Sequence, residues 1–229
     1  MKAVVVDGVW KYYGDYPALR NVSLEAPGGA CLALIGRNGA GKTTLLRAIA
    51  GFSRPGKGKI EIFGEAPRET GARRSMGFIG HGISVYDELS ALENLTLFGK
   101  LYQLADPRSA ALEWLERTGL DRVKDALVRE FSRGMRQRLA LERALLHRPR
   151  LVLFDEPFTG LDDRAVGIVS DRLRALAAGG AIVVLATHDL DLADGLVNRV
   201  VLIRGGRVLS DEVATTGLRA RYRALIGAA

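Results

Sequence analysis

A glycine-rich loop at Gly36–Thr43 is the feature that most constrains what this 229-residue chain can fold into. Its pattern is Gly, four residues, then Gly-Lys-Thr, which is typical of loops that hold phosphate groups. An apolar run at residues 30–35 precedes the loop and has the character of a buried strand. A helical pattern follows and stops at Gly51. This order of strand, loop and helix favours a phosphate loop over a glycine-rich turn with a chance lysine.

The residue types in the loop suit phosphate chemistry. Glycines at positions 36, 39 and 41 let the backbone bend sharply and bring its N–H groups close to an anion. The helix behind the loop points its positive end at the same anion. Lys42 adds a cation for the outer phosphates, and the Thr43 hydroxyl can ligate Mg²⁺. The predicted binding residues are Gly36, Arg37, Asn38, Gly39, Ala40, Gly41, Lys42, Thr43 and Thr44.

Composition excludes some classes of protein and leaves others open. The net charge of +7 permits nucleic acid, acidic lipid or phosphate as a partner, but it fits a solvated basic surface equally well because no basic tail is present. The single cysteine, Cys31, lies in the apolar run and is expected to be a core residue. Neither a signal peptide nor an apolar run of about 20 residues is found. We expect a cytosolic protein, or one bound to a membrane only through a partner.

Strands that alternate with helices predict an α/β fold with a mainly parallel sheet. Residues 3–9 and 18–26 are expected to form an antiparallel layer, with a turn at 11–14, and residues 68–74 to be polar and exposed. Further strands are predicted at 30–35, 59–64, 75–81, 151–156 and 181–187, and a hairpin at 200–209. Helices are predicted at 90–106, 110–118, 131–146, 162–178, 189–195 and 215–226.

One stretch of the chain carries no strand pattern. From about residue 86 to 147 the apolar residues have helical spacing, and Ser90 with Glu93 has the spacing of a capping box. We interpret this stretch as a helical subdomain inserted into the α/β layer. The chain is then a single domain, 1–229, whose core and antiparallel layer comprise residues 1–85 and 148–229.

Polar side chains follow two of the predicted buried strands, at the strand ends where ligands bind in open α/β sheets. Asp155 is placed to anchor Mg²⁺, and Glu156, one residue later, to hold or deprotonate an attacking water. His188 follows the next strand and could donate a hydrogen bond to a transferring phosphoryl group. Ser132 and Gly134 open a helix and would form a second anion site, although alone they would be an ordinary N-cap.

Taken in order, these motifs resemble those of the ATP-binding cassette (ABC) family over essentially the whole chain. Gly36–Thr43 match its Walker A loop and residues 151–155 its Walker B strand, followed by the catalytic Glu156. Residues 159–162 match its D-loop, and His188 its switch histidine. The fold that this resemblance implies is a P-loop NTPase of the ABC type, with a parallel core sheet, an antiparallel β layer and a helical subdomain.

The resemblance also implies the remaining site residues and partners. Tyr13 would stack on adenine, although a plain strand-end tyrosine stays open as an alternative. Residues 131–135 occupy the signature position and keep Ser132 and Gly134, while Arg133 and Met135 depart from the family pattern. The implied assembly is a head-to-tail dimer with each ATP between Lys42 and the partner's Ser132. Hydrolysis of ATP, with Mg²⁺, would drive membrane permease subunits from the cytoplasmic face of the cell membrane.

The cargo is predicted from a departure at His81, where the family usually has Gln. The Gly-His pair and residues 87–95 resemble the haem-exporter branch of the family, which serves cytochrome c maturation. His81 would replace Gln as a nucleotide-site residue. Another small exporter, for a drug, lipid or polysaccharide, remains an alternative. A DNA-associated ATPase is disfavoured because the segment between Lys42 and Ser132 holds no heptad pattern and no cysteine pair, so no nucleic-acid partner is expected.

Overall fold

A six-stranded sheet forms the centre of the computed structural model, which describes residues 2–80, 84–159, 161 and 163–227. The strand order is β5-β6-β7-β3-β8-β9, and all neighbours are parallel except β8 and β9, which form a hairpin. The strands are β3 (Cys31–Ile35), β5 (Met76–Ile79), β6 (Leu151–Asp155), β7 (Ile182–Thr187), β8 (Arg199–Arg204) and β9 (Arg207–Val213). The predicted mainly parallel sheet is confirmed.

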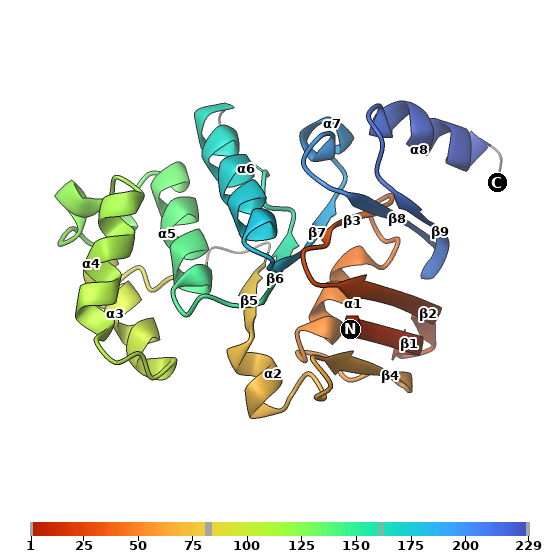
Figure 1. The fold of residues 1–229 in the computed structure, drawn as a ribbon, viewed down its shortest axis with the longest axis horizontal. Helices are drawn as coiled ribbons and strands as arrows, with labels where there is room; N and C mark the ends of the chain where they lie inside the picture. The colour runs from red at the N-terminus through yellow and green to blue at the C-terminus, as the bar shows by residue number, and fades with distance from the viewer. Residues whose placement is uncertain (1, 81–83, 160, 162, 228–229) are drawn as a thin grey trace.

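A second, three-stranded sheet is antiparallel throughout, in the order β2-β1-β4 (Figure 1). Its strands are β1 (Lys2–Tyr13), β2 (Tyr16–Pro27) and β4 (Lys57–Ile62). This confirms the predicted antiparallel layer, but the turn predicted at residues 11–14 is wrong. The first strand continues to Tyr13, which pairs with Tyr16, so the chain turns only at residues 14 and 15.

Eight α-helices lie among the described residues: α1 (Lys42–Ile49), α2 (Thr70–Arg74), α3 (Ala91–Leu101), α4 (Pro107–Arg117), α5 (Arg133–Leu145), α6 (Asp163–Ala178), α7 (Leu190–Ala193) and α8 (Leu218–Gly227). Two short 3₁₀ turns, η1 (Asp121–Val123) and η2 (Val128–Glu130), lie between α4 and α5. Helices α3, α4 and α5 gather at one end of the molecule, and α8 lies at the other (Figure 1). No helix of the described chain combines the length and the apolarity needed to cross a membrane.

Several predicted helix bounds and one predicted exposure need correction. The helix predicted at residues 90–106 ends at Leu101, and the one predicted at residues 189–195 covers only Leu190–Ala193. Residues 68–74 are not all exposed, because α2 forms there and buries Ala72 at 1% exposure. The terminal helix begins at Leu218 rather than residue 215, since Gly217 has a positive φ of 83° that a helix cannot accommodate. The capping box predicted for α3 is confirmed: Glu93 N–H donates to Ser90 Oγ at 3.2 Å, and Ser90 N–H donates to Glu93 Oε2 at 2.8 Å.

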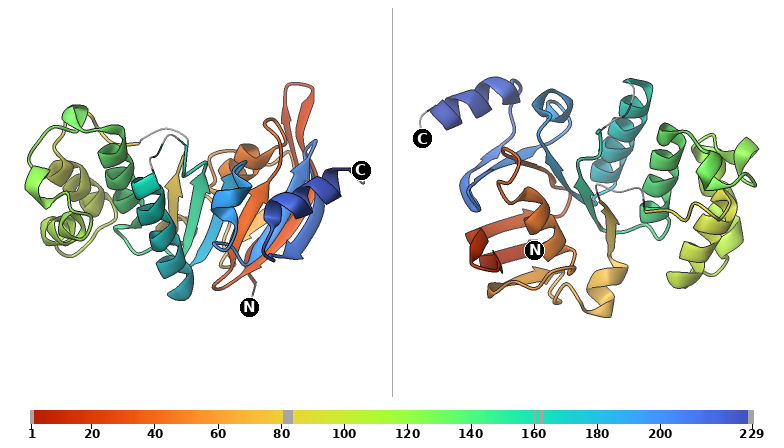
Figure 2. Two further views of the ribbon diagram at one scale, coloured as in Figure 1. Left: turned by 90° about the horizontal axis from the view of Figure 1, so that it is seen from above. Right: turned by 180° about the vertical axis from the view of Figure 1, so that it is seen from behind.

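The central strands are apolar along both faces because the sheet is covered on both sides. In β3, Cys31, Ala33 and Ile35 enter one core cluster, and Leu32 and Leu34 enter the other. This alternation follows from the two-residue period of a strand. The first cluster lies under the helices α3 to α7, and the second joins the sheet to α1 and the antiparallel layer. Figure 2 shows α5 and α6 side by side on the face of the sheet that carries the first cluster.

Candidate functional site

The phosphate loop between β3 and α1 is packed too closely for side chains at two of its glycines. A methyl group added at Gly36 would lie 2.3 Å from the carbonyl oxygen of Ile203. One added at Gly41 would lie 2.9 Å from the carbonyl oxygen of Ala18. Both glycines also have positive φ, 156° and 111°. The sequence therefore needs glycine here for close approach as well as for backbone freedom.

Lys42 begins α1 and turns its ammonium group back over the loop. Its Nζ donates to the carbonyl oxygens of Gly36, at 2.7 Å, and Arg37, at 3.4 Å. The same nitrogen is 4.0 Å from Glu156 Oε1. Burial lowers the pKa of Lys42, and the carboxylates of Glu156 and Asp155 oppose that shift. A cation is thus held over the glycines, where phosphate oxygens would accept from it.

Oxygen ligands suited to Mg²⁺ meet beside this lysine. Thr43 Oγ1 donates to Asp155 Oδ1 at 2.9 Å, across 112 positions of the sequence. Asp155, at the end of β6, is 4% exposed. A hydroxyl and a carboxylate oxygen at this separation fit a small hard cation that keeps some of its water and phosphate ligands. The residues present therefore fit the predicted metal.

Glu156 and His188 lie together at the ends of β6 and β7. His188 Nδ1 is 2.9 Å from Glu156 Oε2. Glu156 has a positive φ of 55°, and its N–H donates to the Ala186 carbonyl at 2.9 Å. A non-glycine residue in this left-handed region is uncommon and clusters at functional sites. The turn aims one carboxylate at both Lys42 and His188.

The sheet order explains why these groups meet. Strand β7 lies between β6 and β3, and all three run parallel. The carboxyl ends of parallel strands share one edge of the sheet, so the loop after β3 faces Asp155 and Glu156 from β6 and His188 from β7. The structure thus brings together five predicted residues: Lys42, Thr43, Asp155, Glu156 and His188.

Ser132 and Gly134 lie apart from this group. Ser132 is the N-cap of α5, and its hydroxyl accepts from Met135 N–H at 3.2 Å. Arg133, a departure from the family pattern, donates from its guanidinium to the carbonyl of Thr159 at 3.2 Å. No hydrogen bond or ion pair among the described residues joins Ser132 or Gly134 to the phosphate loop. A single copy of the chain therefore does not unite them with Lys42.

Two further nucleotide contacts were predicted, at Tyr13 and at His81. Tyr13 is 52% exposed at the end of β1, and Lys11 Nζ lies 5.4 Å from the centre of its ring. Its ring is therefore accessible, while its role with adenine stays a prediction. His81 lies outside the described residues.

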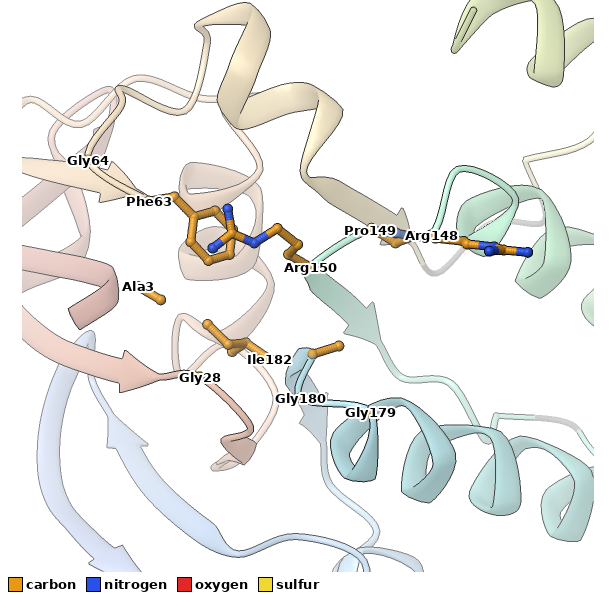
Figure 3. A pocket seen from close by; sticks show the side chains of 11 residues that line it. Ala3, Gly28, Phe63, Gly64, Arg148, Pro149, Arg150, Gly179, Gly180 and Ile182 are labelled. Carbon is orange, nitrogen blue, oxygen red and sulfur yellow. The ribbon is translucent and has the colours of Figure 1, made fainter. Parts of the chain in front are cut away.

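The chain also has a hollow of about 660 Å³ at the opposite edge of the sheet. Figure 3 shows Arg150 there with its guanidinium over the ring of Phe63, at 3.9 Å. None of the predicted site residues lines this hollow. It is therefore separate from the phosphate site.

Sequence patterns did not single out Tyr222 on α8. This half-buried ring lines two hollows beside the phosphate loop, of about 350 and 380 Å³. The spacing of Leu218 and Tyr222, four residues apart in a basic helix, is the signal that would have placed both on one inward face.

Comparisons with known proteins agree with this geometry. The family model described as ABC transporter matches residues 19–159. The chain is 40% identical to the daunorubicin resistance ATP-binding protein DrrA3 of Streptomyces coeruleorubidus, over 93% of this chain and 68% of that protein. It is 37% identical to the Nod factor export ATP-binding protein I of Cupriavidus metallidurans, over 89% of this chain and 68% of that protein.

Solved structures give the same family. An ATP-binding subunit of an ABC transporter superposes with a TM-score of 0.86 at 30% identity, covering 98% of this chain and 93% of that one. The ATP-binding cassette MJ0796, a dimer in a post-hydrolysis state bound to ADP and Pi, superposes with a TM-score of 0.83 at 29% identity, covering 92% and 98%. With the phosphate loop, the carboxylates and the histidine assembled at one sheet edge, the chain belongs to the ABC transporter family and is an ATPase.

Proposed function

We propose that this ATPase powers an ABC exporter for a drug-like small molecule, working as one of a pair of subunits beneath membrane permeases. The observation that carries the ATPase role is the meeting of Lys42, Glu156 and His188 beside the phosphate loop. Export is supported by relatives named for daunorubicin resistance and for Nod factor export, each matching about nine-tenths of the chain.

The proposed chemistry assigns one task to each residue. The loop from Gly36 to Thr43 would bind the phosphates of ATP, and Thr43 with Asp155 would hold Mg²⁺. The metal would neutralise charge on the outer phosphates. Glu156 would position water and accept its proton. His188 Nδ1 faces Glu156 Oε2 at 2.9 Å, and its other ring nitrogen would serve as the donor to a phosphoryl oxygen.

The second half of the nucleotide site would come from another copy of the chain. Ser132 opens α5, where a hydroxyl and free backbone N–H groups face outward at a helix N-terminus. Because no hydrogen bond among the described residues joins Ser132 to the phosphate loop of its own chain, we propose that it contacts ATP held by the partner's Lys42. The dimeric cassette with a TM-score of 0.83 supports this arrangement. Tyr13 and His81 would complete the nucleotide contacts.

A surface that suits a permease lies between the core and residues 86–147, which we propose act as a helical subdomain. It is a hollow of about 700 Å³, here called the docking groove, lined by residues of α2, β5, α3 and α5 and by Phe52 after α1. Phe52 and Leu101 are 58% and 65% exposed. Arg73, Arg74 and Arg143 also line it, and none of its described lining residues carries a carboxylate. An amphipathic segment with an acidic residue would fit this surface.

The docking groove gives the ATPase its proposed place, on the cytoplasmic face of a membrane and attached through the permease. Haem remains a second candidate cargo. It rests on the pattern around His81, which lies outside the described residues, and none of the relatives named above is a haem exporter. We therefore place the drug-like cargo first.

A deletion strain separates the two cargoes. We would complement it with the wild-type gene or with Lys42→Ala, and measure both drug sensitivity and covalently bound haem in membrane proteins. Drug hypersensitivity that only the wild type corrects supports the proposed exporter. Loss of c-type cytochromes, corrected in the same way, would establish haem as the cargo instead. Full correction by Lys42→Ala would contradict a role for ATP hydrolysis.

A further inference from the structure

The terminal helix α8 is tied to the segment that carries His188. Arg219 on α8 forms a two-point ion pair with Asp191 on α7, with Nε–Oδ1 and Nη2–Oδ2 distances of 2.8 and 2.5 Å. Just before the helix, Gly217 N–H donates to Asp194 Oδ2 at 2.8 Å. Helix α7 begins two residues after His188, so these contacts restrain the loop in which the histidine stands.

A second attachment fixes the direction of α8. Arg221 donates from Nε and Nη2 to Glu212 Oε2 on β9, at 3.0 and 2.7 Å. Ser210 donates to the other oxygen of Glu212 at 2.8 Å, and these two partners lower the pKa of that carboxyl. Leu218 is buried in the core at 4% exposure. Held by α7 on one side and β9 on the other, α8 cannot rotate freely (Figure 1).

This orientation places Tyr222 beside the phosphate loop. One hollow, of about 380 Å³, is lined by Tyr222 together with Gly36, Arg37, Asn38 and His188. The other, of about 350 Å³, is lined by Tyr222, residues 37–40, the end of β8 and the first residue of the turn after it. A tyrosine ring is large and has only two side-chain torsions, so it can restrain a neighbouring backbone at low entropic cost.

The backbone that borders these hollows together with Tyr222 is the part of the loop that holds the ammonium group of Lys42. The carbonyl oxygens of Gly36 and Arg37 accept from Lys42 Nζ. A shift of this backbone after a change at Tyr222 would therefore move the ammonium group of Lys42. It would also alter the space beside His188, which borders the same hollow. No other described residue of α8 lines either hollow.

We propose that α8 is a clamp, and that Tyr222 is a positioning residue which keeps the phosphate loop and the His188 loop in the arrangement that hydrolysis needs. The inference rests on the proposed roles of Lys42 and His188. It adds a third element, outside the recognised motifs, to the ATPase site. Because the ring is not proposed to touch a reacting atom, its removal should lower the rate of ATP turnover more than the affinity for nucleotide.

The test is a set of full-length variants assayed for ATP hydrolysis at saturating Mg²⁺ and ATP. Tyr222→Ala should lower kcat by roughly tenfold or more, because small misplacements of catalytic groups are costly. KM for ATP should change by less than about threefold, the pattern of a residue that acts on the transition state. Tyr222→Phe should keep kcat within about twofold of the wild type, since it retains the ring and nearly all of the side-chain volume.

Arg223→Ala is the matched control, because Arg223 is an exposed neighbour on α8 that lines neither hollow. The ion pair is tested by Asp191→Arg and Arg219→Asp, each expected to lower kcat by roughly two- to fivefold at low salt. The double variant with exchanged charges should recover most of the loss. This rescue remains informative if Tyr222→Ala fails to fold, which its thermal melt would reveal.

Several results would overturn the clamp. These are an unchanged kcat in Tyr222→Ala, an equal loss in Tyr222→Phe, or a rise in KM alone, which would make Tyr222 a nucleotide contact. If Tyr222→Ala does not fold, the clamp is overturned when the double variant Asp191→Arg, Arg219→Asp recovers none of the kcat lost in the single variants. Lys42→Ala separates failure of the clamp from failure of the proposed function. If Lys42→Ala hydrolyses ATP like the wild type, the role proposed for Lys42 is wrong, and the clamp that rests on it is wrong as well.

Discussion

At the scale of single residues, Lys42 and Glu156 face each other in a site that solvent reaches only in part. Their side chains are 6% and 14% exposed, and Nζ and Oε1 are 4.0 Å apart. This separation is too long for a hydrogen bond, so attraction holds the charges without fixing the carboxylate. His188 instead provides the short contact, at 2.9 Å. Glu156 is thus oriented by the histidine while one oxygen stays available for water.

The first prediction concerns this carboxylate. Glu156→Gln keeps the shape of the side chain but cannot accept a proton, so hydrolysis should fall by roughly a hundredfold or more. ATP should still bind and trap the dimer, which gel filtration with MgATP would detect. Phosphate release measured beside Glu130→Gln, an exposed glutamate, supplies the control. Wild-type turnover in Glu156→Gln would refute the assigned role.

At the scale of elements, one buried carboxylate links α5 to α6 and, through an arginine of α6, to α4. Glu142, 4% exposed, lies 3.3 Å from the guanidinium of Arg172 on α6. That guanidinium lies 4.5 Å from the ring of Trp114 on α4. Burial raises the pKa of Glu142 to about 7, while Arg172 and Arg117 oppose the shift. The three helices therefore share a titratable contact.

The second prediction follows from that raised pKa. The ordinary value is 4.5 and the folded value about 7, so between them the folded state binds more protons than the unfolded state. The stabilisation is complete below about pH 4.5 and is lost as the pH rises through about 7. Relative to Glu142→Gln, the wild type should lose up to about 3 kcal/mol of unfolding free energy across this window.

Urea unfolding of both proteins between pH 5 and 8 would measure this difference. Glu116→Gln, an exposed carboxylate on α4, is the matched control and should leave the pH dependence unchanged. A constant difference between wild type and Glu142→Gln across the whole range would contradict the raised pKa.

The third prediction compares two helix caps. Ser90 caps α3 and Ser132 caps α5, each with a hydroxyl that accepts from a backbone N–H at 3.2 Å. Each change to Ala should cost about 1 kcal/mol of unfolding free energy. Ser132→Ala should also lose roughly tenfold or more of ATPase activity, since its hydroxyl is proposed to reach the partner's ATP. Equal ATPase rates in the two variants would mean that Ser132 only caps α5 and does not contact the partner's ATP.

At the scale of the whole molecule, the ATP site and the docking groove lie in different parts of the fold but share elements. Strand β5, which lines the groove through Met76 and Phe78, pairs with β6, which ends at Asp155. Helix α5 is capped by Ser132 and lines the groove further along through Arg143 and Ala144. Rigid strands and helices of this kind can carry a movement from one site to the other.

The fourth prediction concerns the docking groove. Phe52→Glu places a carboxylate where an apolar and acidic partner segment is proposed to bind, so it should prevent copurification with the permease and abolish export. The ATPase activity of the isolated chain should stay within about twofold, because Phe52 lies outside the nucleotide site. Leu209→Glu, at an exposed apolar residue on β9, is the control. Normal export by Phe52→Glu would show that the permease does not bind at the docking groove.

Much of this site could be predicted from sequence because its parts are local. The glycines of the phosphate loop, the carboxylates after β6 and the cap of α5 depend on neighbours within a few residues. The helix boundaries were less certain because they depend on backbone angles, as the positive φ of Gly217 delays α8. Strand β1 extends beyond the predicted residues 3–9 because its pairing with β2, and not its composition, determines where it ends.

The sequence by itself determined the family, the phosphate loop and the identity of the residues that meet at the sheet edge. Only the tertiary structure decided that β7 lies between β6 and β3, which brings Thr43 to 2.9 Å from Asp155. It also decided that Glu142 is buried against Arg172 and that Tyr222 borders the loop. Such contacts join residues far apart along the chain, and they exist only once apolar burial has fixed the packing of whole elements.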